Sequence, residues 1–157
     1  KTNNSGAFRF KVDTSAAGTY TITMVFSKKG YSEQRTVYTA TRTLTEADQQ
    51  AQWREEAVKP AYSTLTSKLK GYTDRVMVYS LYYVGGESIG GQWVMQMAMD
   101  KKGDTYRNLV IVTTDADPGL IVGDQVRMYG RCTGAYSYDN GEGAKTYPGF
   151  SLLFWDK

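Results

Sequence analysis

Histidine is absent from the 157 residues of this sequence, while cysteine occurs once and proline three times. Without histidine the chain has no Ser-His-Asp or Cys-His catalytic group and no His-ligated zinc, so acid–base chemistry would rest on carboxylates, lysine or tyrosine. The single cysteine, Cys132, excludes a disulfide within the chain. No apolar run approaches the roughly 18 residues of a membrane-spanning helix. These absences narrow the possible catalytic chemistry, and because no motif names a reaction we predict a non-enzymatic protein with no metal and no cofactor.

The composition favours a folded protein with a packed core. Hydrophobic residues make up 41% of the chain, and 13 tyrosines stand against 5 phenylalanines. Tyrosine-, threonine- and serine-rich strands without a disulfide framework fit an exported bacterial protein. The chain begins at Lys1 rather than Met and carries no charged-then-apolar leader. We therefore expect a piece of a secreted or cell-envelope protein whose leader lies upstream.

Residues 1–45 show the two-residue periodicity of β-strands. Apolar residues alternate with polar ones over 8–12, again over 20–26, and around Val37 and Tyr38. The segments 13–18 and 27–30 separate these runs and are rich in Gly, Ser and Asp, which form turns. The pattern predicts three antiparallel strands, which are barely enough for an independently stable sheet.

The residues from Asp13 to Tyr20, Asp-Thr-Ser-Ala-Ala-Gly-Thr-Tyr, followed by Thr-Ile-Thr-Met, resemble the tyrosine corner of immunoglobulin-like sandwiches. Residues 1–45 as a whole resemble the last three strands of a bacterial Ig-like domain. The resemblance implies a partial β-sandwich in which Tyr20 holds the corner. Because the earlier strands of such a domain are missing, we expect strand exchange between copies and hence a homo-oligomer.

Residues 46–71 change to helical periodicity. Thr43 or Thr45 is placed to cap a helix, with Glu46 or Asp48 three residues later as the capping-box partner. Pro60 interrupts this helix, and a second piece follows with apolar residues at helical spacing and Gly71 at its end. We predict a short helical linker between two β units, with Trp53, Val58 and Leu65 packed on one neighbour. A peptide-binding role for the linker is the less favoured alternative.

Residues 72–157 return to strand periodicity, in five runs at 75–84, 92–99, 107–114, 125–138 and 150–155. The segment Leu120-Ile-Val-Gly-Asp124, followed by Val126-Arg-Met-Tyr-Gly-Arg131, resembles the OB fold. The likeness is closest to the anticodon-binding-like OB family that recurs in exported bacterial proteins. It implies a five-stranded barrel over 72–157. The predicted fold class is therefore mainly β, with a C-terminal OB-like barrel, a helical linker and an N-terminal partial sandwich.

Two groups of residues in the barrel are candidate ligand contacts. In the fourth run Arg127, Tyr129 and Arg131 alternate with an apolar row and are predicted to face outward, where they would grip or stack a ligand. Tyr136, Tyr138 and Tyr147 flank the Gly-rich loop at 139–143 and suit contact with a sugar. Cross-strand pairing and packing over the barrel end are the structural alternatives for the two groups. The row Trp93, Met95, Met97 and Met99 is predicted to lie in the barrel interior.

The distribution of charge separates the remaining hypotheses. Residues 1–45 contain seven basic and two acidic residues, 46–71 contain four of each, and 72–157 contain eight basic and ten acidic residues. Because phosphate neutralisation provides most non-specific affinity, a slightly acidic barrel makes nucleic acid an unlikely partner. We therefore predict a binding or structural module whose barrel contacts a glycan or a protein. The alternatives are an oligonucleotide binder that uses Arg75, Arg107, Arg127 and Arg131, and a hydrolase that uses Asp115 and Asp117.

Overall fold

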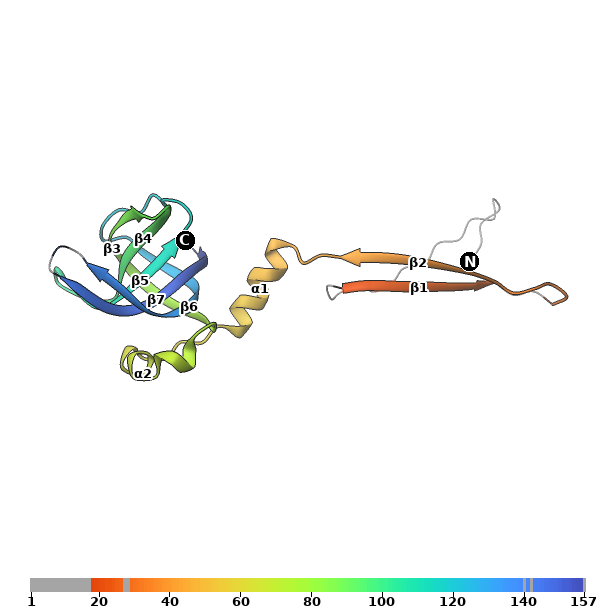
Figure 1. Cartoon of the computed structure of the whole chain (residues 1–157), viewed down its shortest axis with the longest axis horizontal. Helices are drawn as coiled ribbons and strands as arrows, with labels where there is room; N and C mark the ends of the chain where they lie inside the picture. Colours follow the sequence, from red (N-terminus) through yellow and green to blue (C-terminus); the bar gives the residue numbers. More distant parts are fainter. Residues whose placement is uncertain (1–17, 27–28, 140, 142, 157) are drawn as a thin grey trace. The chain divides into compact units, whose positions relative to one another are not determined.

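The computed structural model describes residues 18–26, 29–139, 141 and 143–156 (Figure 1). The chain divides into two compact units, residues 1–49 and 50–157. The fold is mostly β, as predicted, with a two-stranded sheet in the first unit and a closed five-stranded barrel in the second. No helix of the described residues is long and apolar enough to cross a membrane.

The first unit contains an antiparallel sheet of β1 (Gly18–Phe26) and β2 (Gln34–Arg42). Tyr20 pairs with Ala40 and Ile22 with Tyr38, so alternate side chains share one face. None of the described residues of this unit is buried. The predicted strand at 8–12, and residues 13–17 of the predicted tyrosine corner, lie outside the described residues.

The helix α1 (Glu46–Glu56) begins at the capping box that the sequence predicts. The Asp48 N–H donates to Thr45 Oγ1 (3.1 Å), and the Thr45 N–H donates to Asp48 Oδ2 (3.1 Å). Two orphan backbone donors of the first turn are thereby satisfied. The hydrogen bonds from Thr45, together with the Arg42 guanidinium, lower the pKa of the Asp48 carboxyl.

The second unit is a barrel of β3 (Val76–Ile89), β4 (Gln92–Lys102), β5 (Thr105–Thr114), β6 (Gln125–Asp139) and β7 (Ala144–Asp156). The order around the barrel is β3-β4-β5-β7-β6, with β6 closing back on β3. Every neighbouring pair is antiparallel except β5 and β7. The five predicted strands are confirmed, and β7 begins six residues before the predicted start at residue 150. Membership of the OB family stays a prediction.

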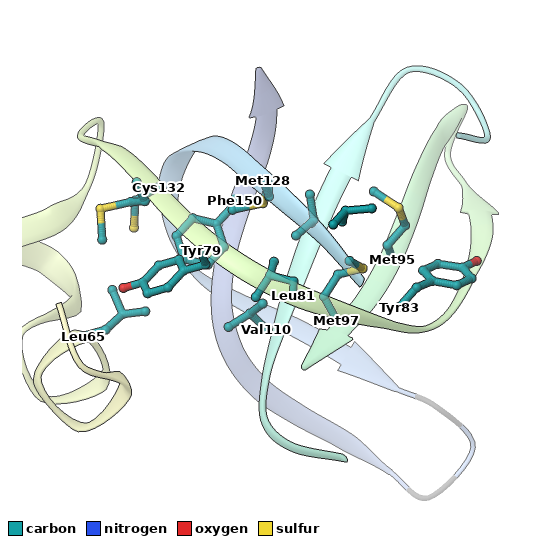
Figure 2. Packing of buried hydrophobic residues seen from close by; sticks show 13 residues of the cluster. Leu65, Tyr79, Leu81, Tyr83, Met95, Met97, Val110, Met128, Cys132 and Phe150 are labelled. Atoms are coloured by element: carbon teal, nitrogen blue, oxygen red, sulfur yellow. The ribbon is translucent and has the colours of Figure 1, made fainter. Parts of the chain in front are cut away.

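The barrel interior is filled by the inward row of each strand (Figure 2). Met95 and Met97 are fully enclosed and Trp93 and Met99 pack against them, so the predicted interior position of this row is confirmed. Phe150 and Tyr79 meet at a ring-centroid distance of 6.0 Å. The buried core cluster comprises Leu65, Met77, Tyr79, Leu81, Tyr83, Met95, Met97, Val110, Val112, Val126, Met128, Cys132 and Phe150.

The segment between Glu56 and the first barrel strand is built into the barrel unit. Val58 pairs with Met77 in a parallel bridge, where its N–H donates to the Val76 carbonyl (3.1 Å). Pro60 lies between α1 and α2 (Tyr62–Ser67), as predicted, and the 3-10 helix η1 (Leu69–Tyr72) leads into β3. Leu65 of α2 is fully buried beside Tyr79 and Val110 (Figure 2). These residues therefore supply part of the barrel core.

Candidate ligand-binding cleft

The Arg127, Tyr129 and Arg131 row does not present three side chains to solvent. Tyr129 is only 4% exposed, so its ring is covered and does not lie open to solvent as the alternation predicts. Its ring stacks on Phe154 at a centroid distance of 4.5 Å and an interplanar angle of 6°. The Arg54 guanidinium of α1 lies 4.7 Å from the Phe154 centroid and is held by Asp156 at 2.7 Å. The end of α1 thus covers the position that sequence alternation assigned to solvent.

The two arginines of the row have separate surroundings. Arg127 is exposed, with its guanidinium 5.7 Å from the centroid of the Tyr129 ring. Arg131 is half-buried, and its Nη1 donates to the Asp74 carbonyl (2.7 Å). Arg131 therefore holds the start of β3, and Arg127 is left as the exposed cation of the row.

The three tyrosines of the β6–β7 hairpin do lie on neighbouring strands. Tyr136 pairs with Tyr147 across the hairpin, and all three rings, including that of Tyr138, are half-buried. The Tyr138 hydroxyl donates to Glu87 Oε1 of β3 (2.8 Å). Burial and the Glu87 carboxylate raise the pKa of Tyr138 to about 12, because both disfavour the phenolate. This cluster ties the β6–β7 hairpin to the β3–β4 hairpin.

A cleft of about 530 Å³ opens where β3, β4 and β5 meet the segment that precedes α2. Its volume lies within the range of small-molecule pockets. We call it the Tyr82 cleft. Its lining residues are Lys59, Pro60, Ala61, Tyr62, Tyr79, Ser80, Tyr82, Met99, Asp100, Lys101, Asn108 and Gln125.

Hydrogen bonds to the backbone fix the wall of the Tyr82 cleft formed by residues 59–62. The Tyr79 hydroxyl donates to the Pro60 carbonyl (2.8 Å), and the Tyr62 hydroxyl donates to the Leu109 carbonyl (3.1 Å). Burial raises the pKa of both phenols, so both remain neutral donors throughout the physiological range. The cleft is therefore preformed, because its aromatic wall is anchored on both sides.

The opposite wall carries a polar pair in an unusual backbone conformation. Asn108 adopts a positive φ of 55° within β5, and its side-chain amide donates to the Asp100 carboxylate of β4. A non-glycine residue in the left-handed region within a strand is strained, and such strain concentrates at functional sites. The strained backbone accompanies an amide and a carboxylate placed side by side at the cleft. Together they offer both donors and acceptors to a ligand.

Two lysines complete the rim of the Tyr82 cleft. Lys101 is held with its Nζ 5.2 Å from the Tyr106 centroid, and Lys59 lies in the opposite wall. The half-buried Tyr82 supplies an aromatic face that is only partly covered by the protein. An aromatic ring beside an amide and a carboxylate suits hydrogen bonding to hydroxyls and stacking on an apolar ring face.

Neither Tyr82 nor its partners are among the ligand contacts that the sequence predicts. Asp100 and Asn108 face each other only because β4 and β5 pair in a register that joins Asp100 with Arg107. One local signal was available, since asparagine tolerates the left-handed conformation better than most other non-glycine residues and Asn108 directly precedes the apolar run of β5. The contribution of Lys59 depends on how residues 57–61 return to the barrel, which no local pattern predicts.

The residues of the alternative hypotheses are not gathered into one site. Arg127 and Arg131 follow the β3–β6 ladder, whereas Arg107 lies on the β4–β5 ladder. Asp117 accepts a hydrogen bond from the Gly119 N–H (2.9 Å) and so acts as a turn former. In the described part of the chain, no three Cys, Asp or Glu side chains converge as a metal site would require. Cys132 is buried in the core, where desolvation raises the pKa of its thiol.

Comparisons of the chain with protein-family models, with curated proteins and with solved structures gave no match.

Proposed function

We propose that this protein is a non-enzymatic binding module whose barrel takes a carbohydrate in the Tyr82 cleft. The observation that carries the proposal is one preformed cleft that joins the Tyr82 ring to the Asp100 and Asn108 pair. A sugar has an apolar face for the ring and neighbouring hydroxyls that both donate and accept hydrogen bonds. The Asn108 amide and the Asp100 carboxylate together offer one donor and several acceptors, which matches that pattern.

Charge favours a sugar over a nucleic acid as the ligand. The cleft combines Lys59 and Lys101 with the Asp100 carboxylate, so no basic track runs through it. Residues 72–157 carry ten acidic against eight basic residues. Strong binding of a polyphosphate chain needs several converging cations, because counterion release supplies most of its affinity. An oligonucleotide is therefore the second-ranked ligand.

The proposed setting is a secreted or cell-envelope bacterial protein. Its support is compositional, namely the tyrosine- and threonine-rich strands and the absence of a disulfide framework. A glycan partner agrees with that setting, since surfaces outside the cell are rich in carbohydrate. The barrel would be the binding part, and the OB resemblance of residues 72–157 agrees with this division because OB barrels bind oligosaccharides as well as oligonucleotides.

The direct test is binding of the full chain to a glycan array and an oligonucleotide array at near-physiological salt. We expect glycan hits that weaken about tenfold or more in Tyr82→Ala, because the stacking face is removed. The matched control is Tyr136→Ala, which removes a half-buried tyrosine of the β6–β7 hairpin and leaves the cleft intact. Equal loss in both variants, or hits confined to oligonucleotides, would contradict the proposal.

A second variant tests the polar pair. Asp100→Ala removes the acceptor of the Asn108 amide and one wall of hydrogen-bonding groups. We expect glycan binding to fall further than in Asp104→Ala, which removes an exposed carboxylate of the neighbouring turn that does not line the cleft. Undiminished binding in Asp100→Ala would move the carbohydrate site away from the cleft.

A further inference from the structure

The Tyr82 cleft is more basic than the barrel that carries it. Its charged lining residues are Lys59, Lys101 and Asp100, so the lining holds two cations and one anion. Residues 72–157 as a whole contain eight basic and ten acidic residues. The walls of a cleft concentrate the field of its charges, because they exclude part of the screening solvent. An excess of positive charge at this cleft therefore favours a ligand that carries negative charge.

A third cation lies beside the cleft on β6. Ser80 and Gln125 line the cleft, and Arg127 pairs with Ser80 in the β3–β6 ladder, two residues along β6 from Gln125. Side chains at paired positions of an antiparallel ladder share one face, with their Cβ atoms about 5 Å apart. Side chains two residues apart in one strand share a face as well. Arg127 is exposed, and it is the next side chain beyond the cleft on that face.

The carboxylate that faces Arg127 across the β6–β7 ladder has another partner. Asp156 is paired with Arg127 in register, but its Oδ1 accepts a hydrogen bond from Arg54 Nη2 (2.7 Å). Within the described residues, no Asp or Glu forms an ion pair with Arg127. Its guanidinium lies 5.7 Å from the centroid of the Tyr129 ring. An exposed side chain changes rotamer within nanoseconds, so Arg127 is free to turn from this ring toward an anion beside Ser80.

Lys59 stands on the other edge of β3. Met77 of β3 pairs with β6 on one edge and with Val58 on the other, so β6 and the segment that contains Val58 flank β3. Lys59 follows Val58 directly, is exposed and lines the cleft. In the described part of the chain, Lys59 forms no ion pair. An anion bound beside Ser80 would therefore have one cation on each edge of β3.

The acidic wall of the cleft is on β4, away from these two cations. The β3–β4 ladder ends at the Tyr82–Ala98 pair, and the cleft opens beyond it between Ser80 of β3 and Asp100 of β4. The Asp100 carboxylate accepts from the Asn108 amide of β5. The cleft thus has one wall suited to hydroxyls and one suited to an anion.

From this division of charge we infer that the carbohydrate of the Tyr82 cleft is an acidic one, whose carboxylate, sulfate or phosphate group lies beside Ser80 between Arg127 and Lys59. The inference rests on the proposed function, since it specifies the sugar that the cleft takes. Arginine donates two parallel hydrogen bonds to such a group, and lysine adds a point charge. Asp100 repels an anion on its own wall, which fixes the orientation of the ligand.

The test compares acidic oligosaccharides with their neutral counterparts on the full chain. The probe pairs are uronic-acid oligosaccharides with their carboxyl-reduced forms, sulfated ones with desulfated forms, and phosphorylated ones with dephosphorylated forms. We expect the acidic member of at least one pair to bind about tenfold more tightly at low salt. That advantage should shrink as sodium chloride is raised, because salt screens exposed charges. The pair that shows the advantage identifies the anionic group.

Two variants test the cations one at a time. Arg127→Gln and Lys59→Gln should each weaken binding of the acidic probe by about threefold to tenfold and change binding of its neutral form by less than about twofold. Arg75→Gln is the matched control, because Arg75 is also exposed, lies with its guanidinium 5.9 Å from the Tyr72 centroid and does not line the cleft. It should leave both affinities unchanged.

Tyr82→Ala distinguishes failure of this inference from failure of the proposed function. Equal affinity for acidic and neutral probes, lost in Tyr82→Ala, would reject the acidic ligand and keep the carbohydrate site. An acidic advantage that is unchanged in both Arg127→Gln and Lys59→Gln would reject it too. A loss in Arg75→Gln as large as in Arg127→Gln would indicate general attraction between charges and would likewise overturn the inference. Absence of binding to every probe would reject both proposals.

Discussion

The β1–β2 sheet and the β3–β7 barrel are built from strands with the same alternation, yet among the described residues only those of the barrel unit enclose a core. Tyr20, Ile22 and Met24 repeat every second residue in β1 as Met95 and Met97 do in β4. In the barrel each inward row meets four other strands, whereas β1 has β2 as its described neighbour. Periodicity therefore assigns a face to each residue, but burial depends on what covers that face.

The largest expected effect is loss of the barrel core. Phe150 is a fully buried residue of β7, the strand that pairs with both β6 and β5. Phe150→Ala removes its ring, so we expect a loss of about 3–5 kcal/mol in the free energy of unfolding. Val37→Ala in the exposed face of β2 should cost no more than about 0.5 kcal/mol. Urea unfolding of the full chain measures both. Equal losses of unfolding free energy in the two variants would contradict the difference in burial between the two regions.

The next effect tests whether the helical segment belongs to the barrel. Leu65→Ala should cost about 2–4 kcal/mol, because Leu65 is fully enclosed by barrel residues. Ser63→Ala, two residues earlier on the exposed side of the same helix, should be close to neutral. The same denaturation experiment decides the point. A loss of unfolding free energy below about 1 kcal/mol for Leu65→Ala would mean that α2 contributes little to the stability of the barrel.

A smaller effect concerns close packing between β6 and β7. A methyl group at Gly149 would lie 2.7 Å from Thr133 Oγ1 and 3.0 Å from Tyr136 Cβ. Gly149→Ala should therefore destabilise the barrel by about 1–3 kcal/mol. Gly85→Ala is the control, because nothing lies within 4 Å of the added atom. In thermal unfolding, Gly149→Ala should have a clearly lower Tm than Gly85→Ala.

The Tyr138–Glu87 hydrogen bond joins the two hairpins, and it should make the free energy of unfolding depend on pH. The pKa of Tyr138 is raised to about 12 in the folded chain. The contribution of its neutral phenol to the stability of the fold is therefore fully present below about pH 10 and is lost as pH rises toward 12. Tyr138→Phe should cost about 1 kcal/mol at neutral pH and flatten this alkaline loss. The difference between absorbance titrations of the unaltered chain and of Tyr138→Phe isolates this phenolate from the other tyrosines, and ionisation of Tyr138 near pH 10 would contradict the hydrogen bond.

The smallest effect lies at the start of α1. The pKa of Asp48 is lowered by the hydrogen bonds from Thr45 and then by Arg42, so its contribution is present above about pH 4 and is lost as pH falls further. Thr45→Ala removes the reciprocal cap and should lower the helical signal slightly at pH 7. In circular dichroism the acid-dependent part of that signal should shrink in the variant. An unchanged acid profile would mean that the capping box does not set the helix end.

Much of the fold was predictable because its determinants are local. The five barrel runs, the interior Trp93 to Met99 row, the break at Pro60 and the Thr45–Asp48 cap all follow from periodicity or from short-range chemistry. The burial of Tyr129 was not predictable, since it depends on Arg54 and Phe154, which lie far away in sequence. The same holds for the Tyr82 cleft, whose walls come from four strands and from residues 59–62. The alternation of apolar and polar residues is a property of a single strand, whereas a binding site combines residues from several strands.

The central claim is that residues 50–157, helical segment included, fold as one cooperative unit that carries the binding cleft. Native-state hydrogen exchange of the full chain, at a concentration below self-association, tests it most directly. We predict that the amides of Val58 and Leu65, which donate to Val76 and Ala61, exchange with the same free energy as those of Met97 and Val112. The amides of β1 and β2 should exchange far faster. Equal protection in the β1–β2 sheet and the barrel, or separate early opening of residues 58–72, would contradict the account.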